Sequence, residues 1–466
     1  MTATDIIVSL ETDFAASMTV VLAQVASVPS SIAIAYSGGL DSSVLLHLMH
    51  RFAQQRSIKL FAFHVHHGLS PRADDWLHHC AAEATKLNIT FAFERIQLSG
   101  IENSGVEAAA RVARYAALGG LCRAQQIPLL LTAHHQDDQA ETVLLQLLRG
   151  SGVAGLSGMD RINAAPDLLG DADLLMARPL LSRSRQQLAD YVAEKSIAYV
   201  DDASNNDPRF ARNALRHQVM PALIQFFPAF QARIARTAKH AQAAQRLLVE
   251  LAVIVHAQCA DGSALVISRL RTLSTDRIDN VLRYWFGTRD VRMPSTAWLA
   301  ELREQLFTAK ADAQLCVTHA DCNIRRHRDR VFITPRSVPI EPEGKPRIAF
   351  KWHGEAELAF ASLGGKLLFE SAAVGVSASW LREQALLIAL RSGGERLKPA
   401  LNRPTRALKY HYQAAEVPAW ERERLPVVSS STVKHLLFAA GIGMDCQYFS
   451  EADVPKITLR WEFDPI

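Results

Sequence analysis

A polar string directly after the first apolar run of the chain has the residue types of a phosphate-binding loop. Residues 32–36 are apolar, residues 37–42 read Ser-Gly-Gly-Leu-Asp-Ser, and a helical pattern follows. Two glycines allow a tight turn that presents N–H groups to a phosphate, and a helix start adds partial positive charge. Asp41 can help to hold the Mg²⁺ that accompanies ATP, and the hydroxyls can donate hydrogen bonds. The predicted ATP-binding residues are Ser37, Gly38, Gly39, Leu40, Asp41 and Ser42.

A second polar string combines imidazoles with carboxylates. Residues 133–142 read Ala-His-His-Gln-Asp-Asp-Gln-Ala-Glu-Thr and follow the fourth apolar run. Asp138 and Glu141 are three residues apart, so both lie on one face at the start of a helix. An acid at a helix start is also a generic stabilising choice, so either acid alone would mean little. Together with the histidines they offer a carboxylate site for a cationic substrate and a Mg²⁺ position beside the phosphates.

Two further groups of polar residues have alternative explanations. His64, His66 and His67 end the second apolar run, where histidines could bind zinc, but no cysteine accompanies them and a single histidine there is usually structural. Arg111 and Arg114 share one face of an Ala-rich helix and need anionic partners. A substrate phosphate or carboxylate would serve, and for Arg111 an ion pair with Glu107 serves equally well.

The elements that must position these side chains alternate along the first part of the chain. Apolar runs of strand length and helical patterns follow one another at residues 32–36, 44–52, 60–65, 73–87, 89–98, 106–124, 127–132 and 138–148. This alternation predicts an α/β fold with a doubly wound, Rossmann-like parallel sheet. Ligands of such sheets bind beyond the carboxyl ends of the strands, and most of the polar strings fall there.

The rest of the chain has a different character. Residues 210–255 predict long helices, and residues 261–335 are mixed, with helices expected at 276–286 and 295–306. A proline-rich stretch at 336–346 is the clearest boundary. The predicted organisation is a catalytic domain at 1–215, a helical linker and middle domain at 216–335, and a small α/β or β-rich domain at 347–466.

Composition narrows the class of protein. Hydrophobic residues make up 49% and charged residues 21%, which is ordinary for a globular protein, and the net charge is +4. Basic clusters at 209–246, 325–330 and 391–409 suit a polyanion that touches several domains, although any one of them alone is better explained as a solvated face. The six cysteines form no C-x-x-C pair, which argues against structural zinc and a redox dithiol. With no signal peptide and no apolar run of about 18 residues, a cytoplasmic protein is expected.

The strings together resemble a known family. Residues 37–42 lack the G-x-x-x-x-G-K-[ST] pattern of Walker A proteins and resemble the PP-loop of enzymes that split ATP between the α and β phosphates. Residues 64–69 and 133–142 resemble the His-x-x-His-Gly-Leu and A-H-H-x-x-D-x-x-E-T motifs of tRNA(Ile)-lysidine synthetases. The resemblance implies that His64 and His66 line the ATP site. It further implies a set that recognises lysine and assists adenylation, namely Arg114, His134, Asp138 and Glu141, with Asp41 also catalytic.

The resemblance to tRNA(Ile)-lysidine synthetases is dense over residues 32–221 and returns near residues 390–426. It also implies a reaction and its partners. It implies that the domains at 216–335 and 347–466 bind tRNA. It also implies substrate or tRNA contacts at Arg111, Asn205, Arg212, Asn213, Arg216, Arg396 and Lys398. The implied enzyme is a carbon–nitrogen ligase of tRNA processing. ATP adenylates carbon 2 of the wobble cytidine of tRNA(Ile) with a CAU anticodon, and L-lysine displaces AMP to give lysidine, which changes the identity from Met to Ile. ATP and Mg²⁺ are expected. An iron–sulfur cluster, a zinc ion, membrane association and a glutaminase partner are not expected.

Two rival functions lack a feature that they need, and a third leaves polar residues unexplained. A tRNA thiolase would need cysteines in C-x-x-C spacing, and a GMP or NAD synthetase would need a glutaminase. A non-catalytic RNA-binding module would not need Asp41 or the acids of residues 133–142.

Overall fold

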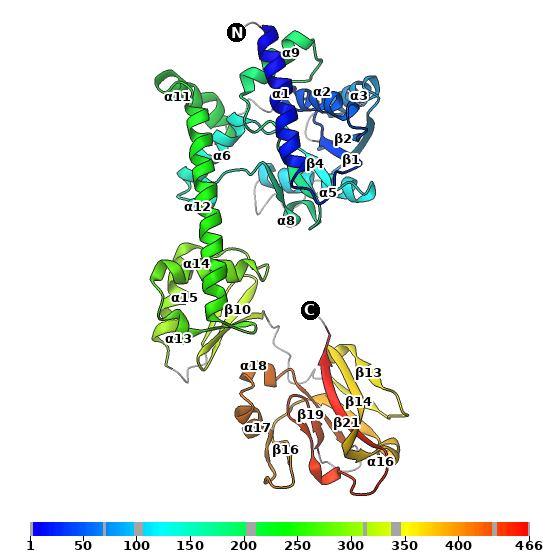
Figure 1. Cartoon of the computed structure of the whole chain (residues 1–466). Coiled ribbons are helices and arrows are strands. Elements are labelled where there is room, and N and C mark those ends of the chain that lie inside the picture. The colour runs from blue at the N-terminus through cyan, green and yellow to red at the C-terminus, as the bar shows by residue number, and fades with distance from the viewer. Residues whose placement is uncertain are drawn as a thin grey trace. The chain divides into compact units, whose positions relative to one another are not determined.

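The computed structural model describes residues 3–68, 71–96, 106–201, 211–310, 315–336, 346–430 and 436–464, with the backbone alone for 3–7 and 106–108. The chain divides into two compact units, Met1–Val253 and Ile254–Ile466 (Figure 1). The predicted boundaries at 215 and 335–347 stay predictions, and most of the proline-rich stretch lies outside the described residues. No helix in the described ranges is long and apolar enough to cross a membrane.

The first unit is built on a six-stranded sheet in the order β3-β2-β1-β4-β6-β5. The strands are β1 (Ser31–Ala35), β2 (Lys59–His66), β3 (Thr90–Arg95), β4 (Leu129–Leu131), β5 (Ile162–Ala164) and β6 (Leu175–Ala177). β1 pairs in parallel with β2 and β4, β2 with β3, and β4 with β6, whereas β5 runs antiparallel to β6. The chain thus extends outward from β1 in both directions, which confirms the predicted doubly wound sheet.

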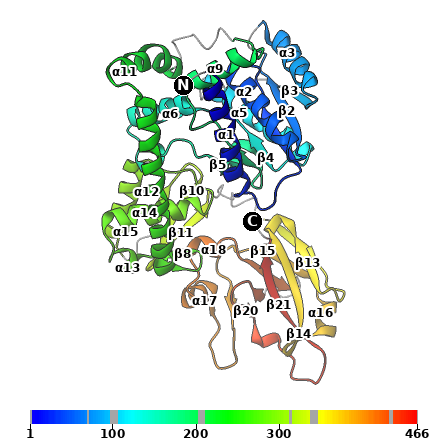
Figure 2. The same ribbon diagram turned by 45° about the horizontal axis from the view of Figure 1, so that its top comes forward.

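Alternate residues of the central strand enter separate cores on the two faces of this sheet. Ile32 and Ile34 pack in one core with α1 (Ala3–Leu22), α2 (Leu40–Gln54), α3 (Ala73–Lys86) and α9 (Arg185–Lys195). Ala33, between them, faces the core that contains residues of α5 (Val106–Ala124) and α8 (Pro166–Leu169). Helices therefore cover both faces of the sheet, which leaves its strand ends as the place for a ligand (Figure 2).

A helical segment follows the sheet, as the composition of residues 210–255 predicts. α10 (Ala211–Ala214) passes through a π-helical turn (Leu215–Val219) into α11 (Met220–Phe226), and α12 (Phe230–Cys259) has 30 residues. A small core of Ala140, Met220 and Phe230 joins α11 and α12 to α6 (Gln136–Leu148). The last turns of α12 belong to the second unit.

The first part of the second unit is a five-stranded antiparallel sheet with helices. Its sheet order is β7-β8-β11-β10-β9, and its elements are β7 (Ala260–Asp261), β8 (Ala264–Val266), α13 (Ile267–Leu270), α14 (Thr275–Gly287), α15 (Thr296–Thr308), β9 (Cys316–Thr318), β10 (Cys322–His327) and β11 (Arg330–Pro335). α14 and α15 confirm the two helices predicted here. Val255 and Cys259 of α12 enter the core formed around Trp285 and Phe286.

Residues 346–464 form a module rich in antiparallel strands. One sheet has the order β12-β15-β18-β19-β20, a second has β13-β14-β21, and β16 pairs with β17. The strands are β12 (Arg347–Phe350), β13 (Glu357–Phe360), β14 (Gly365–Ser377), β15 (Leu386–Leu390), β16 (Arg396–Leu397), β17 (Arg406–Ala407), β18 (Pro426–Ser430), β19 (Leu436–Ala439), β20 (Gly443–Met444) and β21 (Lys456–Phe463). Three short helices accompany them, α16 (Ala378–Glu383), α17 (Leu408–Ala414) and α18 (Ala419–Arg422). Of the two alternatives predicted for this region, the β-rich one describes it.

The predicted basic cluster at 325–330 is not a uniform charged surface. Arg326 is 7% exposed and donates to the carbonyls of Leu306 (3.2 Å) and Ala309 (2.8 Å) at the end of α15. Arg330 pairs with Asp261 at 2.6 Å. The prediction was wrong for Arg326, because a guanidinium that satisfies the carbonyls of a helix end has the same appearance in a sequence as one facing solvent.

Candidate active site

The loop between β1 and α2 places the first turn of a helix at the carboxyl edge of the sheet. Gly39 precedes α2 in an extended conformation, and no side chain of the described residues caps the N–H groups of that turn. The Ser42 hydroxyl donates to the Gly39 carbonyl (2.9 Å), and the hydroxyls of Ser37 and Ser42 lie 3.0 Å apart. The loop therefore holds itself together and leaves N–H groups available for a phosphate.

Glycine is required at position 38 of this loop. Gly38 has a φ of +83°, and a Cβ there would lie 2.8 Å from the Cys80 Sγ and 3.1 Å from a methyl group of Val200. The backbone N–H of Val200 donates to the Gly38 carbonyl at 2.9 Å. The loop consequently packs directly on α3 and on the segment after α9.

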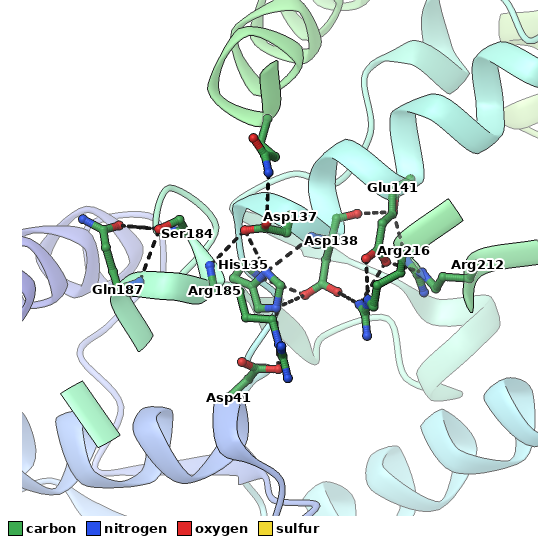
Figure 3. A network of polar contacts seen from close by, with 12 residues as sticks. Asp41, His135, Asp137, Asp138, Glu141, Ser184, Arg185, Gln187, Arg212 and Arg216 are labelled. Carbon is green, nitrogen blue, oxygen red and sulfur yellow. Dashed lines mark hydrogen bonds and ion pairs between the residues drawn. The ribbon is translucent and has the colours of Figure 1, made fainter. Parts of the chain in front are cut away.

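His135 connects this loop with the acids of α6 (Figure 3). Its ring is buried, and Nε2 lies 3.5 Å from Asp41 Oδ2 and 3.4 Å from Asp138 Oδ2. Burial lowers the pKa of His135, but the carboxylates of Asp138 and Asp41 outweigh it and hold the pKa above its ordinary value. The backbone N–H of His135 donates to Asp138 Oδ2 (3.0 Å), and its Nδ1 accepts from the Asp138 N–H (3.4 Å). Nδ1 is therefore an acceptor, and Nε2 faces both carboxylates without a hydrogen bond to any of the described residues.

Two arginines neutralise the acids of α6. Arg216 donates from Nε to Glu141 Oε1 (2.6 Å) and from Nη2 to Asp138 Oδ1 (3.1 Å). Arg212 donates to Glu141 Oε2 (3.1 Å) and to the Thr142 hydroxyl (3.0 Å). Burial raises the pKa of Glu141 and Arg216 opposes this, while burial lowers the pKa of Arg216 and the two carboxylates more than offset it. A cation that enters this site must compete with the guanidinium groups.

The environment of His134 shifts its pKa in the opposite direction from that of His135. Burial lowers the pKa of His134 to about 3; the Asp138 carboxylate opposes this shift, and the guanidinium groups of Arg178 and Arg114 add to it. Its Nδ1 lies 2.9 Å from the Thr132 hydroxyl. His134 is thus a neutral imidazole at physiological pH.

The Asp41 carboxylate has the features of a Mg²⁺ ligand. Its Oδ1 is buried and has no hydrogen-bond partner in the described residues. A buried oxygen without a donor is costly, and Mg²⁺ takes such an oxygen together with substrate phosphates. The described residues include no group of three His, Cys, Asp or Glu side chains that could hold a metal ion. Asp41 therefore fits a cation that phosphate oxygens also hold.

The histidines at the end of β2 are both buried. His64 Nδ1 lies 3.0 Å from the Tyr36 carbonyl, so Nδ1 carries the proton and Nε2 is left as an acceptor. Burial lowers the pKa of His64. His66 Nε2 lies 3.2 Å from Arg95 Nη1, and Arg95 also donates to Asp74 at 2.6 Å.

Arg111 and Arg114 flank one buried ring. Their Cζ atoms lie 4.9 Å and 5.0 Å from the centre of the Tyr115 ring. Neither forms an ion pair with a side chain that the structure describes, and the Glu107 side chain is outside that set. Each guanidinium therefore lies against an aromatic ring and has no carboxylate partner among the described side chains.

The structure brings five of the predicted site residues into one network and places others elsewhere. Asp41, Asp138, Glu141, Arg212 and Arg216 meet in one network (Figure 3). Arg396 and Lys398 belong to the second unit, where Arg396 donates to the Thr405 carbonyl (2.9 Å). Asn213 follows Arg212 in α10, and Asn205 lies outside the described residues.

The sequence analysis placed His135 and Asp137 in the polar string at 133–142 but predicted no individual role for either. His135 is the residue before α6, and a capping pattern with Asp138 three residues later was the available signal. Asp137 Oδ2 accepts from the N–H of Arg185 (2.9 Å), which begins α9. That contact joins residues 48 apart in the chain, so no local pattern reveals it.

Three family models match consecutive parts of the chain. They are a PP-loop domain over residues 10–223, a TilS substrate binding domain over 265–332 and a TilS substrate C-terminal domain over 386–461. The sheet, the 37–42 loop and the first match define the catalytic unit as a PP-loop domain of an ATP-using enzyme.

Curated relatives then identify the family. The chain is 39% identical over 464 residues to the tRNA(Ile)-lysidine synthase of Burkholderia pseudomallei (strain K96243), covering 93% of each protein. It is 40% identical over 423 residues to that of Ralstonia nicotianae (strain ATCC BAA-1114 / GMI1000), covering 89% of each. The chain belongs to the tRNA(Ile)-lysidine synthase family.

Solved structures resemble parts of the chain at low identity. One is the U34-tRNA thiolase NcsA from Methanococcus maripaludis with its [4Fe-4S] cluster, at 17% identity and a TM-score of 0.39, covering 45% of this chain and 70% of that one. Another is a TilS C-terminal domain, at 18% identity and a TM-score of 0.22, covering 26% of this chain and all of that one. Similarity this low carries no functional argument.

Proposed function

We propose that the chain joins lysine to carbon 2 of the wobble cytidine of tRNA(Ile) with a CAU anticodon, using ATP. Family membership supports this activity. The observation that carries it is the line of contacts from Asp41 through His135 to Asp138. This line joins a phosphate loop to a carboxylate site, the two parts that an ATP-dependent ligase for a cationic nucleophile must bring together.

In the first step the cytidine O2 attacks the α-phosphorus of ATP, and the bond to the β-phosphate breaks with release of pyrophosphate. The residues of the 37–42 loop and the N–H groups at the start of α2 bind the phosphates. Asp41 would hold Mg²⁺, which supplies charge neutralisation on the phosphates. His64 and His66 line the nucleotide site.

In the second step the lysine ε-amine attacks carbon 2, AMP leaves and the amine gives up a proton. Asp138 and Glu141 attract the lysine ammonium, and they exchange contacts with Arg216 for contacts with the substrate. A carboxylate of the same pair can receive the proton, because Nδ1 of His135 already accepts from the Asp138 N–H and Nε2 faces two carboxylates. Arg114 and Arg111 share the substrate carboxylate or phosphate beside Tyr115. Arg396 and Lys398 contact the tRNA.

The test is the reaction itself. The protein is incubated with ATP, L-lysine and transcribed tRNA(Ile), and the nucleosides are analysed by mass spectrometry while pyrophosphate is measured in parallel. Lysidine at the wobble position, dependent on both ATP and lysine, is the expected product. Pyrophosphate release without incorporation of lysine would contradict the proposal, and incorporation of sulfur from a sulfide donor would favour a thiolase instead.

A further inference from the structure

Two glutamines from different helices hold one backbone carbonyl. Gln139 lies in α6 between Asp138 and Glu141 and is 3% exposed. Its Nε2 donates to the Met159 carbonyl (3.0 Å), and its Oε1 accepts from the Met159 N–H (2.8 Å). Gln242 of α12 donates from Nε2 to the same carbonyl (3.1 Å) and to that of Ser157 (2.9 Å). The Met159 carbonyl thus uses both of its acceptor positions, one for each helix.

The segment that these glutamines hold has little room to move. Gly158 has a φ of +61°, and a Cβ there would lie 2.7 Å from the Gln139 Oε1. On its other side, Arg178 donates from Nη1 to the Asp160 carbonyl at 2.8 Å. A backbone segment that α6, α12 and the end of β6 all hold can shift only when those elements shift.

α6 and α12 also contact each other at the start of α12. Ala140 of α6 packs with Phe230, and Ile234 lies against the same core. The Gln231 side chain donates to Asp137 Oδ1 at 3.4 Å. α6 therefore has its catalytic acids and its contacts with α12 in the same two turns, so a displacement of α12 reaches the acids.

α12 runs without interruption from these contacts into the part of the chain that matches the substrate binding domain. It spans residues 230–259, and the matched domain begins at 265. Val255 and Cys259 of α12 lie in the core of the second unit. The backbone hydrogen bonds of α12 therefore run without a break from the contacts with α6 to the core of the second unit.

We propose that Gln242 and Gln139 are positioning residues that couple engagement of tRNA by the substrate binding domain to the placement of Asp138 and Glu141. This inference rests on the proposed function. Bound tRNA favours one placement of α12, and the bridge from Gln242 through Met159 to Gln139 carries that preference to α6. The bridge touches no reacting atom, so its loss lowers turnover and leaves substrate affinity in place.

The test compares Gln242→Ala with Gln245→Ala. Gln245 is on the same helix, and its side chain has no hydrogen bond to another residue in the described ranges. We expect Gln242→Ala to lower kcat for lysidine formation on full-length tRNA(Ile) about tenfold, the size expected for one or two neutral hydrogen bonds. The Kd for tRNA and the KM for ATP should change less than about twofold. Gln242→Glu places an acceptor against two carbonyls and should lower kcat at least as much.

A double variant separates coupling from general destabilisation. If both glutamines act through Met159, Gln139→Ala with Gln242→Ala should turn over no more slowly than the worse single variant. Additive losses, or a kcat for Gln242→Ala equal to that of Gln245→Ala, would overturn the proposal. If the wild-type protein makes no lysidine, the proposed function has failed. The bridge is then judged by tRNA-stimulated pyrophosphate release, where the same tenfold loss is expected.

Discussion

Asp41→Asn keeps the size of a side chain whose charge the site requires. Asp41 Oδ2 lies 3.5 Å from the Nε2 of His135, and its Oδ1 is buried without a hydrogen-bond partner among the described residues. Removing one charge-stabilising group from an active site typically costs about 3 kcal/mol in the transition state, so kcat should fall about 10²-fold or more. The fold should lose much less, because an acid in the first turn of a helix contributes about 0.3–1 kcal/mol to stability.

Asp75→Asn is the matched control for this experiment. Asp75 is an exposed acid in the first turn of α3, so its replacement removes the same helix-dipole contribution and leaves the site intact. Pyrophosphate release and thermal unfolding are measured for both variants. The carboxylate of Asp41 helps to raise the pKa of His135, so an NMR titration of Asp41→Asn should place that pKa lower than in the wild type. Near-normal pyrophosphate release by Asp41→Asn, or equal losses in both variants, would refute the reasoning.

Three further outcomes are expected. Gly38→Ala should weaken ATP binding and lower the unfolding free energy by about 1–2 kcal/mol, because φ is +83° and the new Cβ would lie 2.8 Å from the Cys80 Sγ. Calorimetry measures the ATP affinity and thermal unfolding measures the stability; unchanged ATP affinity would contradict the prediction. Asp138→Ala and Glu141→Ala should each raise the KM for lysine far more than that for ATP, and the reverse order would assign the pair to Mg²⁺. Burial lowers the pKa of His134 to about 3, so as the pH falls from 6.5 toward 3 the unfolded chain takes up a proton that the folded chain refuses; unfolding free energy should fall over that window, and less in His134→Asn, as measured by denaturant titration.

Local patterns were sufficient for the elements of the catalytic unit and for their order along the chain. The runs at 32–36 and 60–65 became β1 and β2, and the pattern at 73–87 became α3. Strand and helix periodicities differ, and glycines mark the tight turn between a strand and a helix, so these assignments needed no tertiary information. Short elements without a clear period, β5 and β6, escaped notice, and with them the antiparallel edge of the sheet.

What only the tertiary structure decided is which of the polar residues meet. Glu141 and Arg216 are 75 residues apart, and their 2.6 Å contact depends on how α6 packs against the helices after the sheet. The sequence alone could not distinguish the two adjacent histidines. In the structure, burial lowers the pKa of His134, whereas three neighbouring carboxylates raise the pKa of His135. Residue types and spacing determine which chemistry a chain can perform, because they are properties of single segments. Protonation, pairing and burial depend on groups that distant segments bring within a few ångströms, where the local dielectric and the neighbouring charges set the energies.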